Sequence, residues 1–387
     1  MGKMKCIKWS NTIVLVPYPA QGHVTPMLKL ASAFLIHGFN PVLVTPDYIH
    51  SQIAPKLESK DKIRCVPIPD GLDKDAPRDF FAIEKAMENN MPAHLEKLVH
   101  QLNEDDGVVC VVVDLLASWA IEVANRCGVR AAGFWPAMFA TYRLIGAIPE
   151  MVRTGLISDA GFPKQLGGAR FLPDQPMLSS EELPWLIGTP AARNARFKFW
   201  TRTLDRSKSL QWLLLNSFAN EYCLDDKQSQ HQQLDLHQLV KTTQSQPLVL
   251  PIGPLSKLTT TKNPSFWEED TRCLSWLDKQ NTNTAIQCQK RLLCYPVAGD
   301  QFVNCGYIVN MWRIGVRLVG FGEKDVEEGL KRVMEDDEMG NRLRKLYERT
   351  MGDEANSRAG SNLTGFMDKL KMLTLGYSSD GVYDYHS

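Results

Sequence analysis

A histidine and an aspartate of this chain each follow an apolar segment of strand length, the histidine after six further residues and the aspartate directly. His23 follows the run Thr12–Val16, and Asp114 ends the run Val108–Val113. Imidazole titrates near neutral pH, so His23 could accept the proton of an attacking hydroxyl group, although a single histidine there could also be a surface-loop residue. Gly22 would let the backbone approach a ligand closely. By position alone, Asp114 suits a cap of the segment that follows it.

A second polar group, Asp300 beside Gln301, follows the strand-like run Arg291–Tyr295. An ionised carboxylate only accepts hydrogen bonds, whereas an amide both donates and accepts them, so the pair could bind the hydroxyl groups of a polyol. The same two residues are also typical of a polar turn after a strand. From the residues alone, Asp300 and Gln301 could therefore either bind a polyol or form only a polar turn.

Strand-like and helix-like segments alternate through the first part of the chain. Pro26 can open a helix in which apolar residues keep helical spacing as far as Leu35, and Gly38 can end it. This alternation predicts a doubly wound α/β domain over residues 1 to about 250. Because the carboxyl ends of parallel strands share one edge of the sheet, we expect His23 and Asp114 to lie close together there.

The remaining elements follow from the same patterns. The sequence predicts further strands at Pro41–Thr45, Ala131–Phe134 and Leu213–Leu215, and a short strand followed by a linker at Pro247–Leu255. It predicts helices at Trp119–Cys127, Val303–Met311 and Val326–Arg349.

Composition excludes several classes of protein. The 387 residues contain 44 Lys+Arg and 44 Asp+Glu, so no net charge favours nucleic acid. Nine cysteines without a CxxC pair indicate free thiols and no zinc site. No segment approaches the roughly 20 apolar residues of a membrane helix. We therefore expect a cytoplasmic protein with no metal and no integral membrane segment.

Several short motifs, in order along the chain, resemble those of the plant family-1 UDP-glycosyltransferases. Each motif is weak alone, but together and in this order they are specific. They are Pro17–Pro26, Pro67–Leu72, Leu183–Trp185, Leu215–Phe218, Pro251–Pro254, Cys273–Asp278 and Pro296–Gln301 followed by Asn304.

The resemblance implies a two-domain GT-B fold and a reaction. The family transfers a hexose, expected to be glucose from UDP-glucose, to a hydroxyl of a small lipophilic acceptor such as a phenolic or a terpenoid. Transfer inverts the anomeric centre and needs neither metal nor cofactor. By resemblance, His23 is the general base, Asp114 orients it and stabilises the imidazolium, and Gly22, Asp300 and Gln301 bind the UDP-sugar donor.

The resemblance is interrupted in the second domain. Only 22 steps (300 minus 278) separate Asp278 from Asp300, where the family has several strands and helices that bind the nucleotide. Three βα units of about 30 residues each would fill this gap, so roughly 90 residues are missing. The seam lies between Thr284 and Ala285, which indicates an internal deletion. Pro136 also stands where many relatives carry a hydroxyl residue near the sugar.

These observations predict the organisation and two alternative functions. Residues 1–250 form an acceptor-binding Rossmann-like domain, 251–263 a linker, 264–375 a truncated donor-binding domain and 376–387 a tail. We expect a family member with impaired donor binding, which retains a UDP-sugar as partner only if the donor site survives. The alternative is a non-catalytic protein that binds a small molecule or a partner through the intact first domain.

Overall fold

The computed structural model describes residues 11–57, 63–165, 167–172, 175–218, 247–255, 289–320 and 322–374. Most of the expected linker, from residue 256 to 263, lies outside these described residues. So do the motif Cys273–Asp278, the seam at Thr284–Ala285 and the tail at 376–387. No described helix is long and apolar enough to cross a bilayer.

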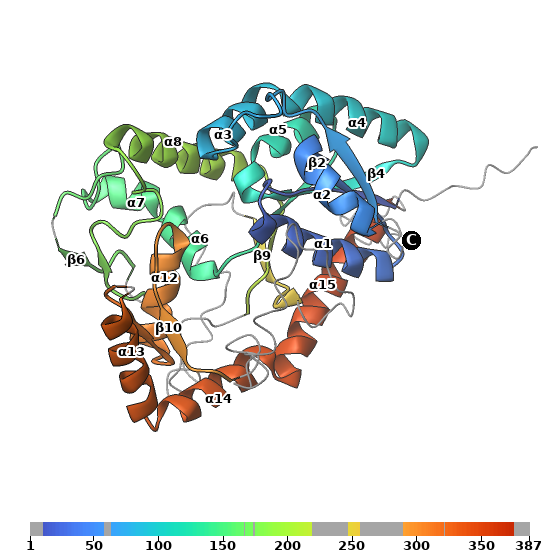
Figure 1. Ribbon diagram of the computed structural model, residues 1–387. Coiled ribbons are helices and arrows are strands. Elements are labelled where there is room, and N and C mark those ends of the chain that lie inside the picture. The colour runs from blue at the N-terminus through green and yellow to red at the C-terminus, as the bar shows by residue number, and fades with distance from the viewer. Residues whose placement is uncertain are drawn as a thin grey trace, which may run out of the picture.

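Seven parallel strands form one sheet, which confirms the expected doubly wound arrangement (Figure 1). Its order is β3-β2-β1-β4-β5-β8-β9, so the strand order reverses between β1 and β4. Such a switch point is where ligands bind in open α/β sheets, at the carboxyl ends of the strands. The strands are β1 (Thr12–Val16), β2 (Asn40–Pro46), β3 (Arg64–Ile68), β4 (Val108–Asp114), β5 (Ala131–Trp135), β8 (Trp212–Leu215) and β9 (Leu248–Pro251).

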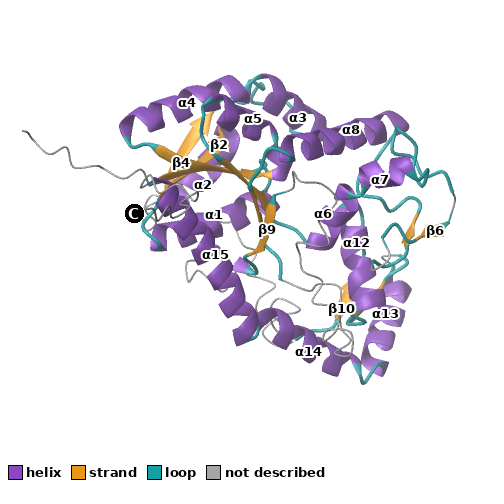
Figure 2. Cartoon of the chain, turned by 180° about the vertical axis from the view of Figure 1, so that it is seen from behind, coloured by secondary structure: helices purple, strands orange, loops and turns teal. Residues whose placement is uncertain are grey.

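Helices cover both faces of this sheet (Figure 2). Alternate residues of β1 show why: Val14 and Val16 belong to one buried apolar cluster, and Ile13 and Leu15 to the other. The first cluster is completed by α3 (Phe80–Asn89), α4 (Met91–Asp105), α5 (Trp119–Arg126) and α8 (Pro190–Ser207). The second is completed by α1 (Gln21–Ile36), α2 (Asp47–Leu57) and α15 (Asp353–Thr374).

Short elements connect these layers. The 3-10 turn η1 (Leu115–Ala117) follows β4, and α6 (Phe139–Gly146) and α7 (Ile148–Arg153) follow β5. A two-stranded antiparallel sheet, β6 (Gly168–Ala169) with β7 (Leu178–Ser179), precedes α8.

The first helix starts earlier than the sequence predicts. Pro26 was expected to open it, but α1 begins at Gln21 and Pro26 lies inside. The amides of His23 and Val24 both donate to the carbonyl of Ala20, at 3.0 and 2.9 Å. Proline is tolerated there because the cost is one helical hydrogen bond near the helix start. His23 therefore sits in the first turn of a helix, not in a loop.

The second part of the chain is small and mostly helical. Two parallel strands, β10 (Leu292–Cys294) and β11 (Gly315–Arg317), form its sheet within the described residues 289–320 and 322–374. Over these described residues helices outnumber strands; the truncated donor-binding domain expected at 264–375 stays a prediction. The helices of the second part are α12 (Asp300–Gly306), the π-helical turn η3 (Tyr307–Met311), α13 (Glu323–Glu335) and α14 (Met339–Met351).

Two predicted helices were wrong in detail. The helix expected to start at Val303 begins at Asp300, so Asp300 and Gln301 open a helix where a polar turn had been one interpretation. The helix expected over 326–349 is divided at Asp336, whose backbone is extended at φ −89° and ψ 90°. The carboxylate of Asp336 accepts a hydrogen bond from the amide of Met339 at 3.0 Å and so caps α14.

The two parts share one apolar core. Val303, Tyr307 and Trp312 of the second part belong to the same buried cluster as β1 and β4. The last described helix, α15, runs from α14 back to the first sheet, where Phe366 packs on Phe34 and Trp212 (Figure 1). The second part therefore packs on the first part twice, through the segment from Val303 to Trp312 and again through α15.

Candidate active site

His23 and Asp114 meet at the switch point of the large sheet. The Nδ1 of His23 lies 2.7 Å from the Oδ2 of Asp114, which confirms the expected proximity of the two side chains. The carboxylate is fully buried, whereas 21% of the histidine side chain is exposed. An ionised carboxylate can only accept, so Nδ1 carries the proton and Nε2 is left as the acceptor.

Both interpretations of Asp114 hold at once, through different oxygen atoms. Oδ1 accepts a hydrogen bond from the amide of Leu116 at 2.9 Å and caps η1. Oδ2 faces His23. The cap fixes the plane of the carboxylate, and the carboxylate in turn orients the imidazole ring. This is the arrangement that a histidine needs to act as an oriented base.

The surroundings of His23 favour its protonated form. Burial alone would lower its pKa, but the charge and hydrogen bond of Asp114, with the charge of Asp300, outweigh burial and raise the pKa above its ordinary value. The ring of Tyr18 contacts the imidazole edge to face at 5.1 Å. Burial, followed by the charge of Asp114, raises the pKa of Tyr18 to about 12, so its phenol stays neutral. The charge of Asp300, which belongs to the second part, thus also favours the protonated histidine.

Asp300 and Gln301 occupy the first turn of α12. Gly299, at φ +64°, precedes them in a conformation that glycine adopts readily. The Oε1 of Gln301 accepts hydrogen bonds from the amides of Val297 and Ala298, at 2.8 and 3.3 Å. Donation through the amide Nε2 is therefore the contact that Gln301 can offer a ligand.

A cavity of about 320 Å³ joins Asp300 to the first domain. It is bounded on one side by Asp300 and Asn304 of α12, and on the other by residues that follow β5 and β8, namely Pro136, Asn216 and Ser217. Pro136, the departure noted in the sequence, thus lies in the wall of the cavity. The cavity is open to water and lies where a small polar ligand could contact both parts of the chain.

Asn304 is a site residue that sequence reasoning did not single out. Its Nδ2 donates to the Oδ2 of Asp300 at 3.0 Å. Its Oδ1 is buried and has no hydrogen-bond partner among the described residues. The spacing of Asp300 and Asn304 in the sequence indicates this contact, because residues four apart lie on one face of a helix. It becomes informative only if the helix is taken to begin at Asp300.

Gly22 lies in the first turn of α1 with helical geometry and is exposed. A Cβ atom added there would meet nothing within 4 Å. Neither backbone conformation nor packing against the protein therefore requires glycine at this position. Its expected contact with a ligand stays a prediction.

Comparison with known proteins gives the family. Over 457 aligned residues, the chain is 46% identical to UDP-glycosyltransferase 82A1 of Arabidopsis thaliana, with coverage of 92% of this chain and 98% of that relative. The chain belongs to the plant UDP-glycosyltransferase family. It is also 26% identical over 316 residues to 7-deoxyloganetin glucosyltransferase of Catharanthus roseus, which covers 74% of this chain and 62% of that enzyme. No family model matches the chain.

Solved structures of UDP-glycosyltransferases confirm the GT-B fold. Os79 from O. sativa in complex with UDP superposes with a TM-score of 0.68 at 17% identity, covering 92% of this chain and all of that one. UGT71G1 of Medicago truncatula, complexed with UDP-glucose, gives 0.68 at 16%, covering 95% and 99%. As a member of this family, the chain belongs to enzymes that transfer a sugar from a UDP-sugar donor and use no further cofactor. Among the described residues, no cluster of His, Cys, Asp and Glu could hold a metal ion.

Proposed function

We propose that the reaction for which this site is built is the transfer of a hexose, glucose from UDP-glucose, to a hydroxyl of a small lipophilic acceptor. His23 accepts the proton from the acceptor hydroxyl on Nε2, and Asp114 stabilises the imidazolium. The acceptor oxygen attacks the anomeric carbon, and the bond to UDP breaks with its electron pair leaving on the diphosphate. Attack opposite the leaving group inverts the anomeric centre.

The observation that carries the proposal is the partly buried hydrogen bond between His23 and Asp114 at the switch point. The charge of Asp300 also raises the pKa of the histidine. In this proposal Gly22 lies against the UDP-sugar donor, and Asp300 and Gln301 bind the sugar hydroxyls. Asn304 adds an acceptor in the same cavity. A general base beside groups that suit a polyol supports transfer to a sugar carbon over other proton-transfer reactions.

Aromatic side chains support a lipophilic acceptor. Six aromatic side chains, here called the aromatic wall, form a continuous row of ring contacts that passes Trp135 at the end of β5, with neighbouring ring centroids 5.2–6.0 Å apart. Phe199, Trp135 and Phe139 of this row are buried. Such rings provide apolar area with a defined orientation, which suits phenolic or terpenoid alcohols. The wall consists of Phe80, Phe199, Trp200, Trp135, Tyr142 and Phe139.

We further propose that donor binding is impaired in this chain by an internal deletion. The alignment with UDP-glycosyltransferase 82A1 extends over 457 residues, against 387 in the whole of this chain, so at least 70 positions of the relative (457 minus 387) face no residue here. The described second part has a sheet of two strands. Diphosphates are held by backbone amides at helix N-termini or by cations, and the family's segment for this purpose is what the sequence lacks.

The second candidate is a non-catalytic protein that binds a small molecule or a partner. The complete seven-stranded sheet and its aromatic wall favour it, because acceptor binding does not require the nucleotide segment. We place the acceptor site in residues 1–250, a linker at 251–263, the truncated donor domain at 264–375 and a tail at 376–387. The five described cysteines are free thiols, which supports the proposed cytoplasmic location.

Measurement of binding and turnover separates these alternatives. Calorimetric titration with UDP, UDP-glucose and a set of phenols and terpenoid alcohols should show acceptor binding without nucleotide binding. A UDP-release assay with the same acceptors should detect no transfer, since loss of even one charge-stabilising donor costs about 10²–10³ in rate. His23→Ala should leave this result unchanged, as should the exposed control His94→Ala on α4.

Repair of the chain provides the decisive control. The corresponding segment of UDP-glycosyltransferase 82A1, inserted between Thr284 and Ala285, should restore transfer. His23→Ala in the repaired chain should then reduce the rate by about 10²–10⁴, whereas His94→Ala should not. Turnover by the unrepaired chain that disappears with His23→Ala would show that the donor site is complete after all. A repaired, active chain that tolerates His23→Ala would remove His23 from the reaction.

A further inference from the structure

Two cysteines of the second part, Cys294 and Cys305, contact each other. Cys294 is the last residue of β10, and Cys305 lies in α12. Their thiols share a hydrogen bond, and neither is in a disulfide. Cys305 is 4% exposed, whereas Cys294 is half-buried, so solvent reaches the pair from the side of Cys294. Two thiols at hydrogen-bond distance need only a small movement to form a disulfide.

The packing of α12 explains why the two thiols meet. The guanidinium of Arg317 lies over the ring of Phe302, 5.7 Å from its centroid. Arg317 is the register partner of Cys294 in the parallel pair of β10 and β11. Cys305 follows Phe302 by three residues, so both side chains lie on one face of α12. That face is directed at the ends of β10 and β11, where Cys294 lies.

Contacts other than those of the thiols hold the two residues in place. The carbonyl of Cys294 accepts a hydrogen bond from the amide of Leu318 at 2.8 Å. The guanidinium of Arg317 pairs with Glu182 at 2.6 Å, which holds the end of β11 against the first part. The separation of Cys294 and Cys305 is therefore set by the packing of α12 on the two strands.

The two thiols differ in acidity. The hydrogen bond that Cys294 donates lowers the pKa of Cys305 and outweighs the effect of burial. The charge of Arg317 also lowers this pKa, whereas that of Glu182 raises it. The same hydrogen bond raises the pKa of Cys294. Cys305 therefore ionises first, and the thiolate is the form of cysteine that reacts with an oxidant.

We propose that Cys294 and Cys305 are a redox-sensitive modification site, which a hydroperoxide oxidises to a disulfide. With hydrogen peroxide, the thiolate of Cys305 attacks one oxygen, the O–O bond breaks and hydroxide leaves, which gives a sulfenic acid. The sulfur of Cys294 attacks the sulfenic sulfur, the S–O bond breaks and water leaves with the thiol proton. The two thiols lose two electrons and two protons, and the peroxide is reduced to two molecules of water.

The disulfide would tie α12 to β10. Asp300 and Gln301 form the first turn of the same helix, so oxidation would fix the element that carries both residues. Disulfides of this kind in reducing compartments are transient and respond to redox conditions. The inference concerns only the thiols and their packing, so it does not depend on the proposed function.

Peptide mass spectrometry of the full chain tests the proposal. The chain is reduced, freed of reductant, treated with increasing hydrogen peroxide, alkylated with N-ethylmaleimide and digested with trypsin. One tryptic peptide, 292–313, contains both cysteines, so the internal disulfide leaves it unalkylated and lighter by two hydrogens. This form should appear at a peroxide concentration about tenfold or more below the one that modifies Cys127, whose pKa is raised by burial. Dithiothreitol should reverse it.

Matched variants identify the thiols. Cys305→Ser should abolish the internal disulfide. Cys294→Ser retains a hydroxyl that can donate to Cys305, so the sulfenic acid of Cys305 should accumulate and react with dimedone. Cys127→Ser, which alters a half-buried thiol 3.9 Å from the Nε2 of His100, should leave the disulfide unchanged. A doubly alkylated peptide 292–313 at peroxide levels that modify Cys127, or a disulfide from either cysteine to a third one, would overturn the pair.

Hydrogen exchange measures the effect on α12. The amides of α12 should exchange about tenfold or more slowly in the oxidised chain, because the disulfide restricts local opening of the helix. The amides of α13, which lies outside the closed loop, should exchange at the same rate in both forms. A disulfide that forms without slowing exchange in α12 would show that oxidation does not fix this helix.

Discussion

Asp114→Asn tests the central pair of the site without disturbing the fold around it. The asparagine carbonyl can still accept the hydrogen bond from the amide of Leu116, so the cap of η1 is retained. The amide NH₂ that replaces Oδ2 faces the Nδ1 of His23. It opposes a protonated Nδ1, and it can donate only to the neutral tautomer that carries its proton on Nε2. A hydrogen bond to a charged group contributes about 1.5–3 kcal/mol. We expect a loss of free energy of unfolding within that range.

The loss should depend on pH, with a defined sign. The folded-state pKa of His23 is raised above its ordinary value of 6.5. The stability that it contributes is therefore complete below pH 6.5 and disappears as the pH rises through the folded pKa. Asp114→Asn removes most of this contribution, so its destabilisation should be larger at about pH 5.5 than at about pH 8.5.

Urea unfolding followed by circular dichroism at both pH values measures the effect. An NMR titration, with the His23 signal assigned by His23→Ala, should show a lower pKa for His23 in Asp114→Asn than in the unsubstituted chain. Asp79→Asn is the matched control, because Asp79 caps α3 and contacts no histidine. An equal loss from Asp114→Asn at both pH values, or an unchanged pKa of His23, would refute the assignment of a functional ion pair.

Two further predictions concern the packing of α15 on the large sheet and the ligand contact expected at Gly22. Phe366→Ala should lower the free energy of unfolding by about 3–5 kcal/mol, because Phe366 is 1% exposed and packs between Phe34 and Trp212. Urea unfolding measures this loss. The exposed control Met372→Ala should change the free energy of unfolding by no more than about 0.5 kcal/mol. Gly22→Ala should leave stability unchanged or raise it by up to about 1 kcal/mol, since its Cβ meets nothing. In the chain repaired at the seam, the same substitution should weaken binding of UDP-glucose in calorimetry, and unchanged binding would remove Gly22 from the donor site.

The fold was predictable where strands are buried on both faces. β1, β4, β5 and β8 are continuous apolar runs, and such runs identify central strands of a parallel sheet. β3 was missed because it is an edge strand: its residues are partly exposed, and Pro67 interrupts the apolar pattern. Proline lacks the amide that a central strand needs and is tolerated at an edge.

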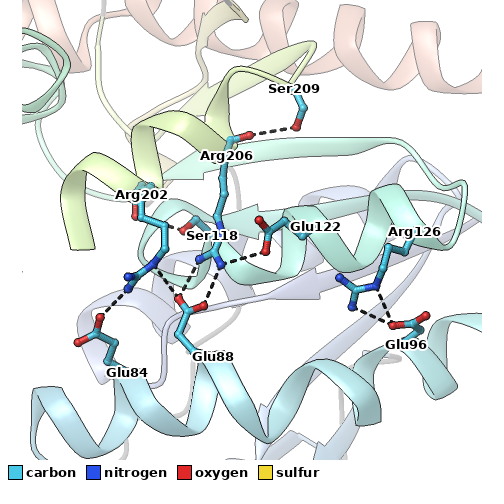
Figure 3. A network of polar contacts seen from close by, with 10 residues as sticks. Glu84, Glu88, Glu96, Ser118, Glu122, Arg126, Arg202, Arg206 and Ser209 are labelled. Atoms are coloured by element: carbon cyan, nitrogen blue, oxygen red, sulfur yellow. Dashed lines mark hydrogen bonds and ion pairs between the residues drawn. The ribbon is translucent and has the colours of Figure 1, made fainter. Parts of the chain in front are cut away.

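The site was predictable only where topology alone determines it. His23 and Asp114 follow adjacent parallel strands, so their proximity needs no knowledge of packing. The ion pair of Arg202 with Glu84 (Figure 3) could not be found in this way, because it joins residues far apart in the sequence. The return of α15 to the first sheet was likewise outside any local pattern.

The packing of the second part explains how this chain can keep its sugar-binding residues in place without a nucleotide segment. Trp312 packs on Phe218 of the first part with ring centroids 6.1 Å apart, and Arg317 pairs with Glu182 at 2.6 Å. α15 then carries the chain back to the large sheet, where Phe366 is buried. Each of these contacts is made by the first domain and the residues after the seam. The position of Asp300 therefore depends on contacts between the first domain and the residues after the seam. In the proposed function, these contacts keep Asp300 and Gln301 in place although the segment that would bind the diphosphate is missing.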